Sequence, residues 1–341
     1  MTLLASGVDS FSGIHPFLLV LAAAGLDRLV GDPRWCLHPV VVMGWWISRL
    51  RQLAESWAKG SPRRLRLAGC GITLLLVLGS GGAGWWLEEI CQTRPWTWPL
   101  LVIALASALA GRSLEQAVQA VLAALKTSTD LGPARTALGW IVGRDTTELS
   151  RQEILRAAAE TASENAVDGL FAPLFWMLIG AALWPYGGPG PLALAWGFKA
   201  ASTLDSMLGY RRGSLRWLGT AGAKLDDLLV WLPCRLVALS LPLVQRRTAR
   251  RALTLAQLAL QEGQPDPSPN AGVSQAIYAH CLDVQLGGVN RYGERETQKP
   301  LLAAGAPAPE ASDVERLLDL SRRLEVLWLA AALLVGSAVH R

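Results

Sequence analysis

Long stretches without any charged residue constrain this chain more than any other feature. The longest runs from Gly169 to Phe198 and has 30 residues, and the run from Leu67 to Leu87 has 21. A helix needs about 20 apolar residues to cross the hydrocarbon core of a bilayer. Charged residues make up 17% of the chain, whereas a soluble globular protein usually carries about a quarter. The sequence therefore predicts an all-α, polytopic integral membrane protein and excludes a disordered or soluble globular chain.

The apolar runs predict about five transmembrane helices, together with re-entrant or interfacial helices and a large cytoplasmic-side helical and loop region. The turn-forming residues of Trp184–Pro191 divide the longest run into a hairpin of two short helices. Pro233 and Arg235 interrupt the run from Leu228 to Val244, so a re-entrant or surface-lying segment is expected there. The firmest predicted spans are 67–87, 95–111, 169–185, 191–208 and 324–340. The predicted cytoplasmic loops are 31–66, 112–168, 209–227 and 245–323, in one membrane-embedded domain covering 1–341.

The distribution of basic residues predicts the orientation. Six Lys and Arg residues lie between Arg49 and Arg66, whereas the connector after Trp86 has one, Arg94. Basic residues near spans favour the cytoplasmic side, so we expect a multi-pass protein of the cytoplasmic (inner) membrane with its polar loops in the cytoplasm. The Lys and Arg residues flank apolar runs and form no basic stripe, so no nucleic acid partner is expected.

Three carboxylates near a membrane entry are the strongest candidate site. Glu160, Glu164 and Asp168 recur at helical spacing and would stack on one helix face. Three like charges on one stripe repel one another unless a cation lies among them, and magnesium prefers carboxylate oxygens. An acidic face exposed to solvent is the alternative interpretation.

Further polar residues lie in the predicted cytoplasmic loops. Arg144, Asp145 and Thr146 precede the carboxylate stripe, although Thr146 or Thr147 could equally be an N-cap. Asp205 lies at the end of a predicted span, Lys224–Asp227 supplies a cation and paired carboxylates, and Ser268–Gly272 is typical of a turn. Neither a P-loop nor a dinucleotide-binding glycine motif is present. The residues alone predict an acidic, magnesium-capable cytoplasmic site.

Six groups of motifs follow one another along the chain. They are Leu26–Pro33 with His38–Val40, Val142–Thr146, Glu160–Gly169 with Ala172–Phe175, Thr203–Tyr210, Lys224–Asp227 with Pro233–Arg235, and Ser268–Gly272 with Leu286–Gly288. In these motifs, from about Leu26 to Leu302, the chain resembles the adenosylcobinamide-phosphate synthase (cobinamide synthase) family of cobalamin-biosynthesis integral membrane proteins. The family usually continues the Ser-Pro-Asn-Ala-Gly motif with Trp-Pro-Glu, whereas this chain has Val273-Ser-Gln275. A glutamine cannot replace a glutamate as a base or an anionic ligand.

The resemblance implies an ATP- and magnesium-dependent amide ligase. Such an enzyme joins aminopropanol, or its O-phosphate, to the propionate carboxylate of adenosylcobyric acid, with an acyl phosphate as the expected intermediate. Adenosylcobyric acid, aminopropanol phosphate and the lipid bilayer are the expected partners. A homo-oligomer, or contact with other cobalamin-pathway membrane enzymes, stays open. Two alternatives are a non-catalytic membrane sensor or scaffold of the same fold and, less favoured, a transporter.

The resemblance also implies roles for individual residues. The catalytic candidates are Asp145, Glu164, Asp168, Lys224 and Asp227. The candidates for binding ATP or the substrates are Arg144, Thr146, Asn165, Arg211, Ser268 and Asn270. The magnesium candidates are Glu160, Glu164, Asp168, Asp205 and Asp226. Trp140, Trp217 and Trp231 are expected either to wall the corrin or to anchor the protein at the membrane interface.

Overall fold

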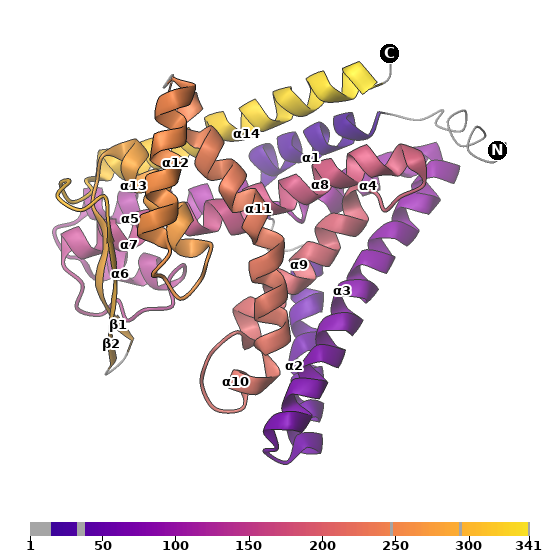
Figure 1. Ribbon diagram of the computed structural model, residues 1–341, viewed down its shortest axis with the longest axis horizontal. Coiled ribbons are helices and arrows are strands. Elements are labelled where there is room, and N and C mark those ends of the chain that lie inside the picture. The colour runs from indigo at the N-terminus through magenta and orange to yellow at the C-terminus, as the bar shows by residue number, and fades with distance from the viewer. Residues whose placement is uncertain (1–14, 33–37, 246–247, 293–294, 340–341) are drawn as a thin grey trace. The chain divides into compact units, whose positions relative to one another are not determined.

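The computed structural model describes residues 15–32, 38–245, 248–292 and 295–339 (Figure 1). Pro33 of the first motif and residue 340 of the last predicted span lie outside this range. The sequence led us to predict one domain, and the contacts gather into two compact units, which are described separately below. Unit 1 comprises residues 1–110, 172–229 and 331–341, and unit 2 comprises 111–171 and 230–330.

Helices account for nearly all of the regular structure, which confirms the all-α class. Unit 1 contains α1 (Pro16–Val30), α2 (Pro39–Ala58), α3 (Pro62–Thr93), α4 (Trp98–Ala106), α8 (Ala172–Leu183), α9 (Pro191–Leu208) and α10 (Leu215–Leu218). Unit 2 contains α5 (Gly111–Thr127), α6 (Gly132–Gly139), α7 (Arg151–Ala166), α12 (Ala249–Gly263) and α13 (Ala271–Leu282), with strands β1 (Leu286–Tyr292) and β2 (Arg295–Leu302). Helices α11 (Thr220–Val244) and α14 (Ala311–Val339) have residues in both units.

Four helical segments of the described chain are long and apolar enough to cross a membrane. They are Pro62–Thr93, Trp98–Thr127, Arg151–Tyr186 and Thr220–Val244. The first three contain or overlap the predicted spans 67–87, 95–111 and 169–185. Helices α9 and α14, which correspond to the predicted spans 191–208 and 324–340, are not among the four; α9 carries Lys199 and Asp205 within its 18 residues.

The segment 228–244, which the sequence predicts to be re-entrant or surface-lying, belongs to helix α11, and this helix is long and apolar enough to cross a membrane. Helix α11 is continuous over 25 residues with Pro233 and Pro242 inside it. The guanidinium of Arg235 donates to the side chain of Asn270 and, at 2.8 Å, to the carbonyl of Pro269. Because these acceptors satisfy the charge, Arg235 does not have to break the helix.

The predicted hairpin in the longest apolar run is confirmed in unit 1. Helix α8 ends at Leu183, a short 3-10 turn covers Trp184–Tyr186, and α9 begins at Pro191 and packs on α8. Helix α9 also packs along α3, where a Cβ at Gly84 would lie 2.9 Å from the backbone of Ala193. Glycine at this position therefore allows the two backbones to approach closely.

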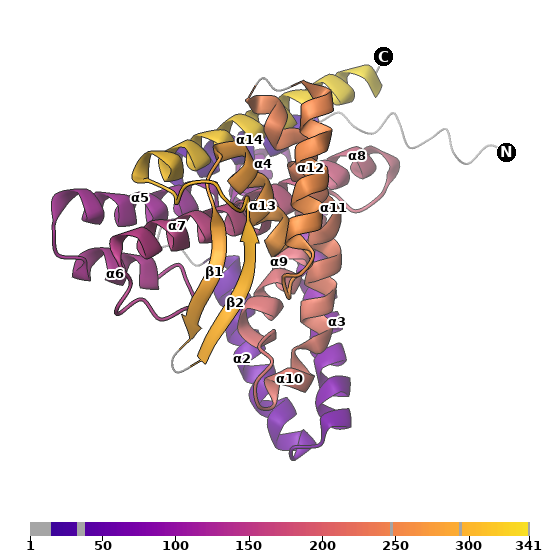
Figure 2. The same ribbon diagram turned by 60° about the vertical axis from the view of Figure 1, so that its left-hand side comes forward.

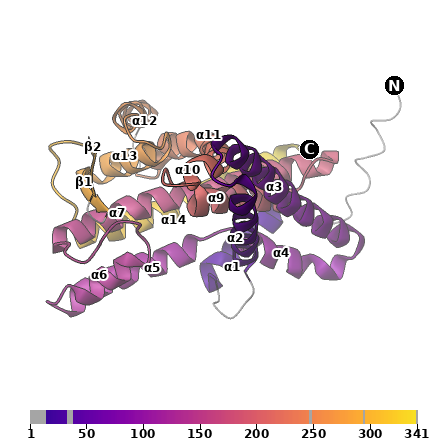
Figure 3. The same cartoon turned by 90° about the horizontal axis from the view of Figure 1, so that it is seen from below.

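Unit 2 contains a β-hairpin that the sequence analysis did not predict (Figure 2). Strands β1 and β2 pair antiparallel, with Val289 opposite Gln298, and the register shifts between Leu286 and Gly288. Gly287 has a φ of +83°, and a Cβ there would lie 1.9 Å from the carbonyl oxygen of Pro300. This irregularity requires glycine. On the helical side of the unit, α5, α6 and α7 pack against one another (Figure 3).

Candidate functional site

Glu160 is the centre of a buried cluster in unit 2 that joins three of the sequence motifs. Its side chain is 2% exposed and accepts hydrogen bonds from the guanidinium of Arg144 and, at 2.9 Å, from the backbone N–H of Gly287. Arg144 is 9% exposed and also donates to Oδ1 of Asn290 at 2.7 Å. The predicted magnesium ligand Glu160 and the predicted phosphate-binding Arg144 therefore neutralise each other.

Arg156 completes this arginine–glutamate cluster from one turn earlier on α7. Its guanidinium donates to the carbonyl oxygens of Gly287 and, at 2.8 Å, Val289. Its Nε lies 4.0 Å from Oε1 of Glu160. The two arginines and the glutamate thus connect β1 to α7. The cluster has one more positive than negative charge.

A polar pocket of about 210 Å³ adjoins this cluster. Three arginine side chains line it, those of Arg144, Arg156 and Arg291, and so do four carboxylates, those of Asp145, Glu148, Glu153 and Glu296. The guanidinium of Arg291 is 53% exposed and reaches Glu148 at 3.4 Å and Glu296 at 3.5 Å. The three guanidinium groups can donate to a phosphate, and the four carboxylates of the same pocket oppose an anion unless a cation accompanies it.

The loop before α7 is ordered by its own side chains. Oδ1 of Asp145 accepts hydrogen bonds from the backbone N–H and the hydroxyl of Thr147, at 2.9 and 2.7 Å. These bonds hold the pKa of Asp145 below its usual value, so it is ionised at neutral pH. The N-cap of α7 is Ser150, which forms a capping box with Glu153. Neither Thr146 nor Thr147 caps this helix.

A second cluster, the Glu164 cluster, combines Glu164, Asp266, Gln275 and Lys299. The amide of Gln275 donates to Glu164 at 2.9 Å, and the ammonium of Lys299 lies 3.0 Å from Asp266. Burial lowers the pKa of Lys299, but the charges of Glu164 and Asp266 raise it more, so its pKa lies above the usual value. Lys299 is therefore a permanent cation beside two carboxylates.

Glu160 and Glu164 lie one turn apart on α7, as predicted, but the α-helical spacing does not continue to Asp168. Glu160 contacts Arg144 and Glu164 contacts Gln275, so the two carboxylates have separate partners. After Ala166 the backbone forms a π-helical turn over Val167–Phe171, which includes Asp168. A π turn changes the direction of the side chains that follow.

Asn165, Ser268 and Asn270 are the remaining site candidates of unit 2. Asn165 donates to the hydroxyl of Thr161 at 3.0 Å. Asn270 accepts from Arg235, and the Ser268 N–H donates to Asp266 at 3.0 Å. The predicted turn at Ser268–Gly272 covers Ser268–Asn270, and helix α13 begins at Ala271. Asn270 and Ser268 therefore lie close to the Glu164 cluster.

Unit 1 contains its own group of carboxylates, the aspartate cluster of Asp205, Asp226 and Asp227. Their charges act on one another, and Lys199 is the cation that acts on Asp226. Oδ1 of Asp226 is buried and has no hydrogen-bond partner among the described residues. An unsatisfied buried carboxylate oxygen is costly unless a ligand or an ion completes it.

The donor sets differ in how well they fit a magnesium ion. The described residues contain no group of three His, Cys, Asp or Glu side chains arranged to hold a metal. Glu160 and Glu164 already have protein partners, whereas Asp226 has an unused oxygen. Magnesium often takes only one or two protein carboxylates and keeps its waters, so the aspartate cluster fits it better than the stripe on α7.

The structure groups the predicted site residues within each unit. Unit 2 holds Arg144, Asp145, Thr146, Glu160, Glu164, Asn165, Asp168, Ser268 and Asn270, and unit 1 holds Asp205, Arg211, Lys224, Asp226 and Asp227. Arg211 and Lys224 make no ion pair within the described part of the chain. Of the three tryptophans, Trp140 is largely exposed, Trp231 is half exposed, and Trp217 lies between the guanidinium groups of Arg66 and Arg216.

Sequence reasoning missed four residues of these clusters. They are Arg156, Asp266, Asn290 and Lys299. Asn290 follows the Leu286–Gly288 motif closely, and Asp266 precedes Ser268, so proximity to motifs was a usable signal for both. Lys299 had no signal, because a single lysine in a polar segment is usually solvated.

Comparisons with known proteins give a consistent result. A family model described as "CobD/Cbib protein" matches residues 20–321. The chain is 40% identical over 335 residues to the "Cobalamin biosynthesis protein CobD" of Synechocystis sp., covering 96% of this chain and 94% of that protein. It is 36% identical over 314 residues to the "Cobalamin biosynthesis protein CbiB" of Salmonella typhi, covering 90% and 92%. It is 37% identical over 317 residues to a protein named CobD from Klebsiella pneumoniae, with the same coverage. No solved structure matches the chain.

Proposed function

Because the chain belongs to the CobD/CbiB protein family and acts in cobalamin biosynthesis, we propose that its reaction there is an amide ligation. The enzyme joins aminopropanol, or its O-phosphate, to the propionate carboxylate of adenosylcobyric acid and consumes ATP in the presence of magnesium. The product is adenosylcobinamide or its phosphate. The protein works in the cytoplasmic (inner) membrane with its site facing the cytoplasm.

One observation carries the proposal. Three motifs meet at Glu160, which accepts hydrogen bonds from Arg144 and from the N–H of Gly287, 127 residues further along the chain. Three guanidinium groups line the pocket beside this ion pair. A phosphoryl-transfer enzyme uses such groups, because its main task is to position and neutralise anions.

The reaction requires activation of a carboxylate. An oxygen of the propionate attacks the γ-phosphorus of ATP, ADP leaves, and an acyl phosphate forms. The amine nitrogen then attacks the acyl carbon and inorganic phosphate leaves, so the bond to nitrogen replaces the bond to oxygen. The polar pocket beside Arg144, Arg156 and Arg291 is our candidate for holding the phosphate during transfer.

The remaining roles are assigned within each unit. In unit 1, Asp205 and Asp226 are the residues that would hold magnesium, and Asp227 is the candidate for accepting the proton from the attacking ammonium. Magnesium, when bound, supplies neutralisation of phosphate charge. In unit 2, Asp145 keeps the pocket loop in place through Thr147, and Asn165, Ser268 and Asn270 remain candidates for contacts with the corrin amides.

The alternative function, a sensor or scaffold of the same fold, is favoured by one specific observation. Gln275 stands where the resemblance predicts a glutamate, and its amide donates to Glu164. An amide at that point removes one negative charge from the Glu164 cluster. If catalysis depends on that charge, the chain binds the corrin without ligating it.

Ligation by the detergent-purified protein tests the proposal. The protein is incubated with adenosylcobyric acid, aminopropanol phosphate and magnesium-ATP, and the mass of the corrin is measured. We expect the mass to increase by one amide-linked aminopropanol phosphate, only when ATP and magnesium are both present. Product with free aminopropanol or ethanolamine phosphate alone corrects the amine. No product with any amine, from protein that still binds the corrin, contradicts the ligase and favours the sensor.

A matched pair of variants tests the magnesium assignment in the same assay. Asp226→Asn removes the negative charge at the unsatisfied oxygen. Loss of this charge should weaken magnesium binding without abolishing it, because the other ligands and the waters remain. We therefore expect the magnesium concentration for half-maximal ligation to rise at least about tenfold. Asp283→Asn is the control, because Asp283 is exposed with a φ of +60°, which asparagine also tolerates. Equal magnesium dependence of both variants would remove Asp226 from the metal site.

A further inference from the structure

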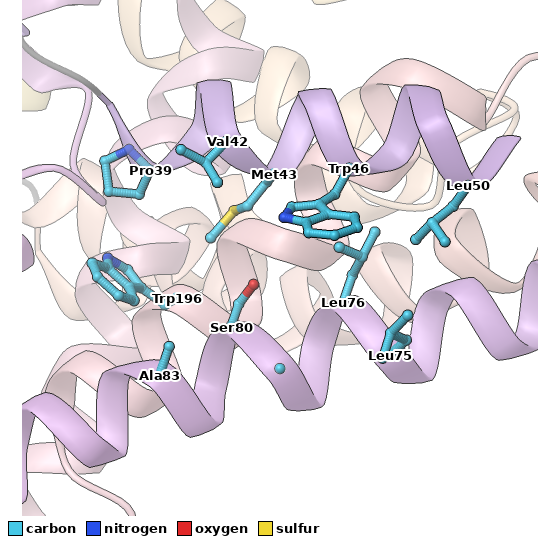
Figure 4. A pocket seen from close by; sticks show the side chains of 11 residues that line it. Pro39, Val42, Met43, Trp46, Leu50, Leu75, Leu76, Ser80, Ala83 and Trp196 are labelled. Atoms are coloured by element: carbon cyan, nitrogen blue, oxygen red, sulfur yellow. The ribbon is translucent and has the colours of Figure 1, made fainter. Parts of the chain in front are cut away.

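An apolar groove of about 500 Å³ lies between α2 and α3 in unit 1. In Figure 4 the side chains of α2 and α3 face each other across it, and Trp196 of α9 lies at the end near Pro39 and Ala83. Its walls are mostly apolar, and their polar side-chain atoms are the hydroxyl of Ser80 and the indole nitrogens of Trp46 and Trp196. The residues that carry the argument are Trp46, Leu50, Leu75, Leu76 and Trp196.

One wall of the groove belongs to a helix that is long and apolar enough to span a membrane. Helix α3 lies within a segment long and apolar enough to span, and Leu75 on its groove wall is 59% exposed. Gly79 also lines the groove, and a Cβ added there would meet nothing within 4 Å. An exposed apolar groove beside a helix long enough to span a membrane fits an apolar occupant of the size of a lipid chain.

Several basic side chains of the α2–α3 hairpin have no carboxylate partner among the described residues. Five basic residues of α2, α3 and the turn between them have no ion pair within the described parts of the chain: Arg49, Lys59, Arg63, Arg64 and Arg66. The nearest carboxylate in the sequence, Glu55, is already bound to Arg51 at 3.0 Å and accepts from Ser214 at 2.6 Å. Clusters of four or more basic residues beside a membrane helix attract anionic lipid head groups.

Aromatic contacts connect these cations to the groove. The guanidinium of Arg49 lies 5.6 Å from the ring centroid of Trp45. The Trp45 ring meets the Trp46 ring edge to face, with centroids 4.8 Å apart, and Trp46 lines the groove. The positive charge of Arg49 therefore lies next to Leu50, the last residue of α2 that lines the groove.

We propose that this groove binds one anionic phospholipid, with an acyl chain between α2 and α3 and the phosphate at Arg49. The charges decide against a second copy of the chain as the occupant. Two copies in the same membrane share one orientation, so a symmetric contact through this face places the same five basic residues of both copies at the same depth. Like charges brought together in this way oppose association, whereas a lipid phosphate neutralises them. The site is independent of the proposed ligation.

Native mass spectrometry with a competing lipid pair tests the proposal. The purified full-length protein is incubated with equal amounts of phosphatidylglycerol and phosphatidylcholine of the same acyl chains. We expect one retained phosphatidylglycerol per chain. Gly79→Leu fills the groove and should lower this retention by about tenfold or more. Gly71→Leu is the control, because it adds the same side chain to the same helix in open space outside the groove.

The head-group assignment has its own pair of variants. Arg49→Gln should reduce the preference for phosphatidylglycerol by about fivefold, the effect of one basic residue at a membrane surface, and leave phosphatidylcholine retention unchanged. Arg250→Gln, which removes an exposed charge from α12, should change nothing. Equal retention of the two lipids, or unchanged retention in Gly79→Leu, overturns the proposal. A lipid-free dimer that Gly79→Leu dissociates assigns the groove to a second copy and overturns it too.

Discussion

The ion pair between Arg144 and Glu160 gives the sharpest prediction about stability. Arg144→Ala leaves the Glu160 carboxylate, 2% exposed, with only the Gly287 N–H as a hydrogen-bond donor. Removing one partner of a buried pair costs about 3–5 kcal/mol. Arg156, 4.0 Å away, still supplies some positive charge, so we expect the lower end, about 3 kcal/mol. At about 2 °C per kcal/mol for a chain of this size, the thermal midpoint should fall by about 6 °C.

A thiol-reactive fluorogenic dye measures this midpoint in detergent. Cys234 and Cys281 of unit 2 are buried and react when the unit opens, and the exposed Cys70 is replaced by serine in every variant so that it does not react in the folded protein. The control is Arg291→Ala, which removes the same side chain from the same pocket but from a position 53% exposed, where ion pairs contribute about 0–1 kcal/mol. Equal midpoints for the two variants would refute the view that Glu160 depends on Arg144.

Two further predictions concern packing and pH. Gly263→Ala places a Cβ 2.5 Å from the backbone of Gly272, so it should separate α12 from α13 and destabilise the protein by about 1–3 kcal/mol in the same melt. Lys299, whose pKa is raised above 10.5 by Glu164 and Asp266 against the effect of burial, stabilises the fold fully below about pH 10.5 and loses this effect as the pH rises through its folded pKa. The difference in stability between wild type and Lys299→Met, followed by tryptophan fluorescence, should therefore be largest below pH 10.5 and shrink above it.

The predictions for Gly263→Ala and Lys299→Met each have a matched control variant. Gly71→Ala adds a methyl group in open space on a helix and should be neutral or slightly stabilising. A loss equal to that of Gly263→Ala would show that helix contact is not the cause. Lys126→Met is the control for the same substitution, because it removes an exposed lysine. If Lys299→Met behaves in the same way, the charges around Lys299 do not stabilise the fold.

Local chemistry made the helical hairpin at 184–191 predictable. Its prolines and glycines permit few conformations, so the turn follows from the sequence alone. Arg235 shows the opposite case, because its partners Asn270 and Pro269 lie about 35 residues further along the chain. Without them, a charge in an apolar run indicates a break in the helix.

The sequence predicts which residues belong to the candidate site, but not which of them contact one another. Helical spacing places Glu160 and Glu164 near one face, and both are indeed in buried clusters. Which group neutralises each one depends on the β1–β2 hairpin, which brings Gly287, Asn290 and Lys299 to α7. That hairpin follows from a glycine-dependent irregularity and long-range pairing, and neither has a periodic signal in the sequence.

The most direct test of the proposed chemistry follows the carboxylate oxygen. Adenosylcobyric acid labelled with oxygen-18 in the propionate carboxylate is incubated with the protein, aminopropanol phosphate and magnesium-ATP. Activation by phosphoryl transfer predicts that one labelled oxygen appears in inorganic phosphate for each amide formed. Amide formation with unlabelled phosphate would contradict the acyl phosphate, and the absence of any amide from corrin-binding protein would contradict the ligase itself.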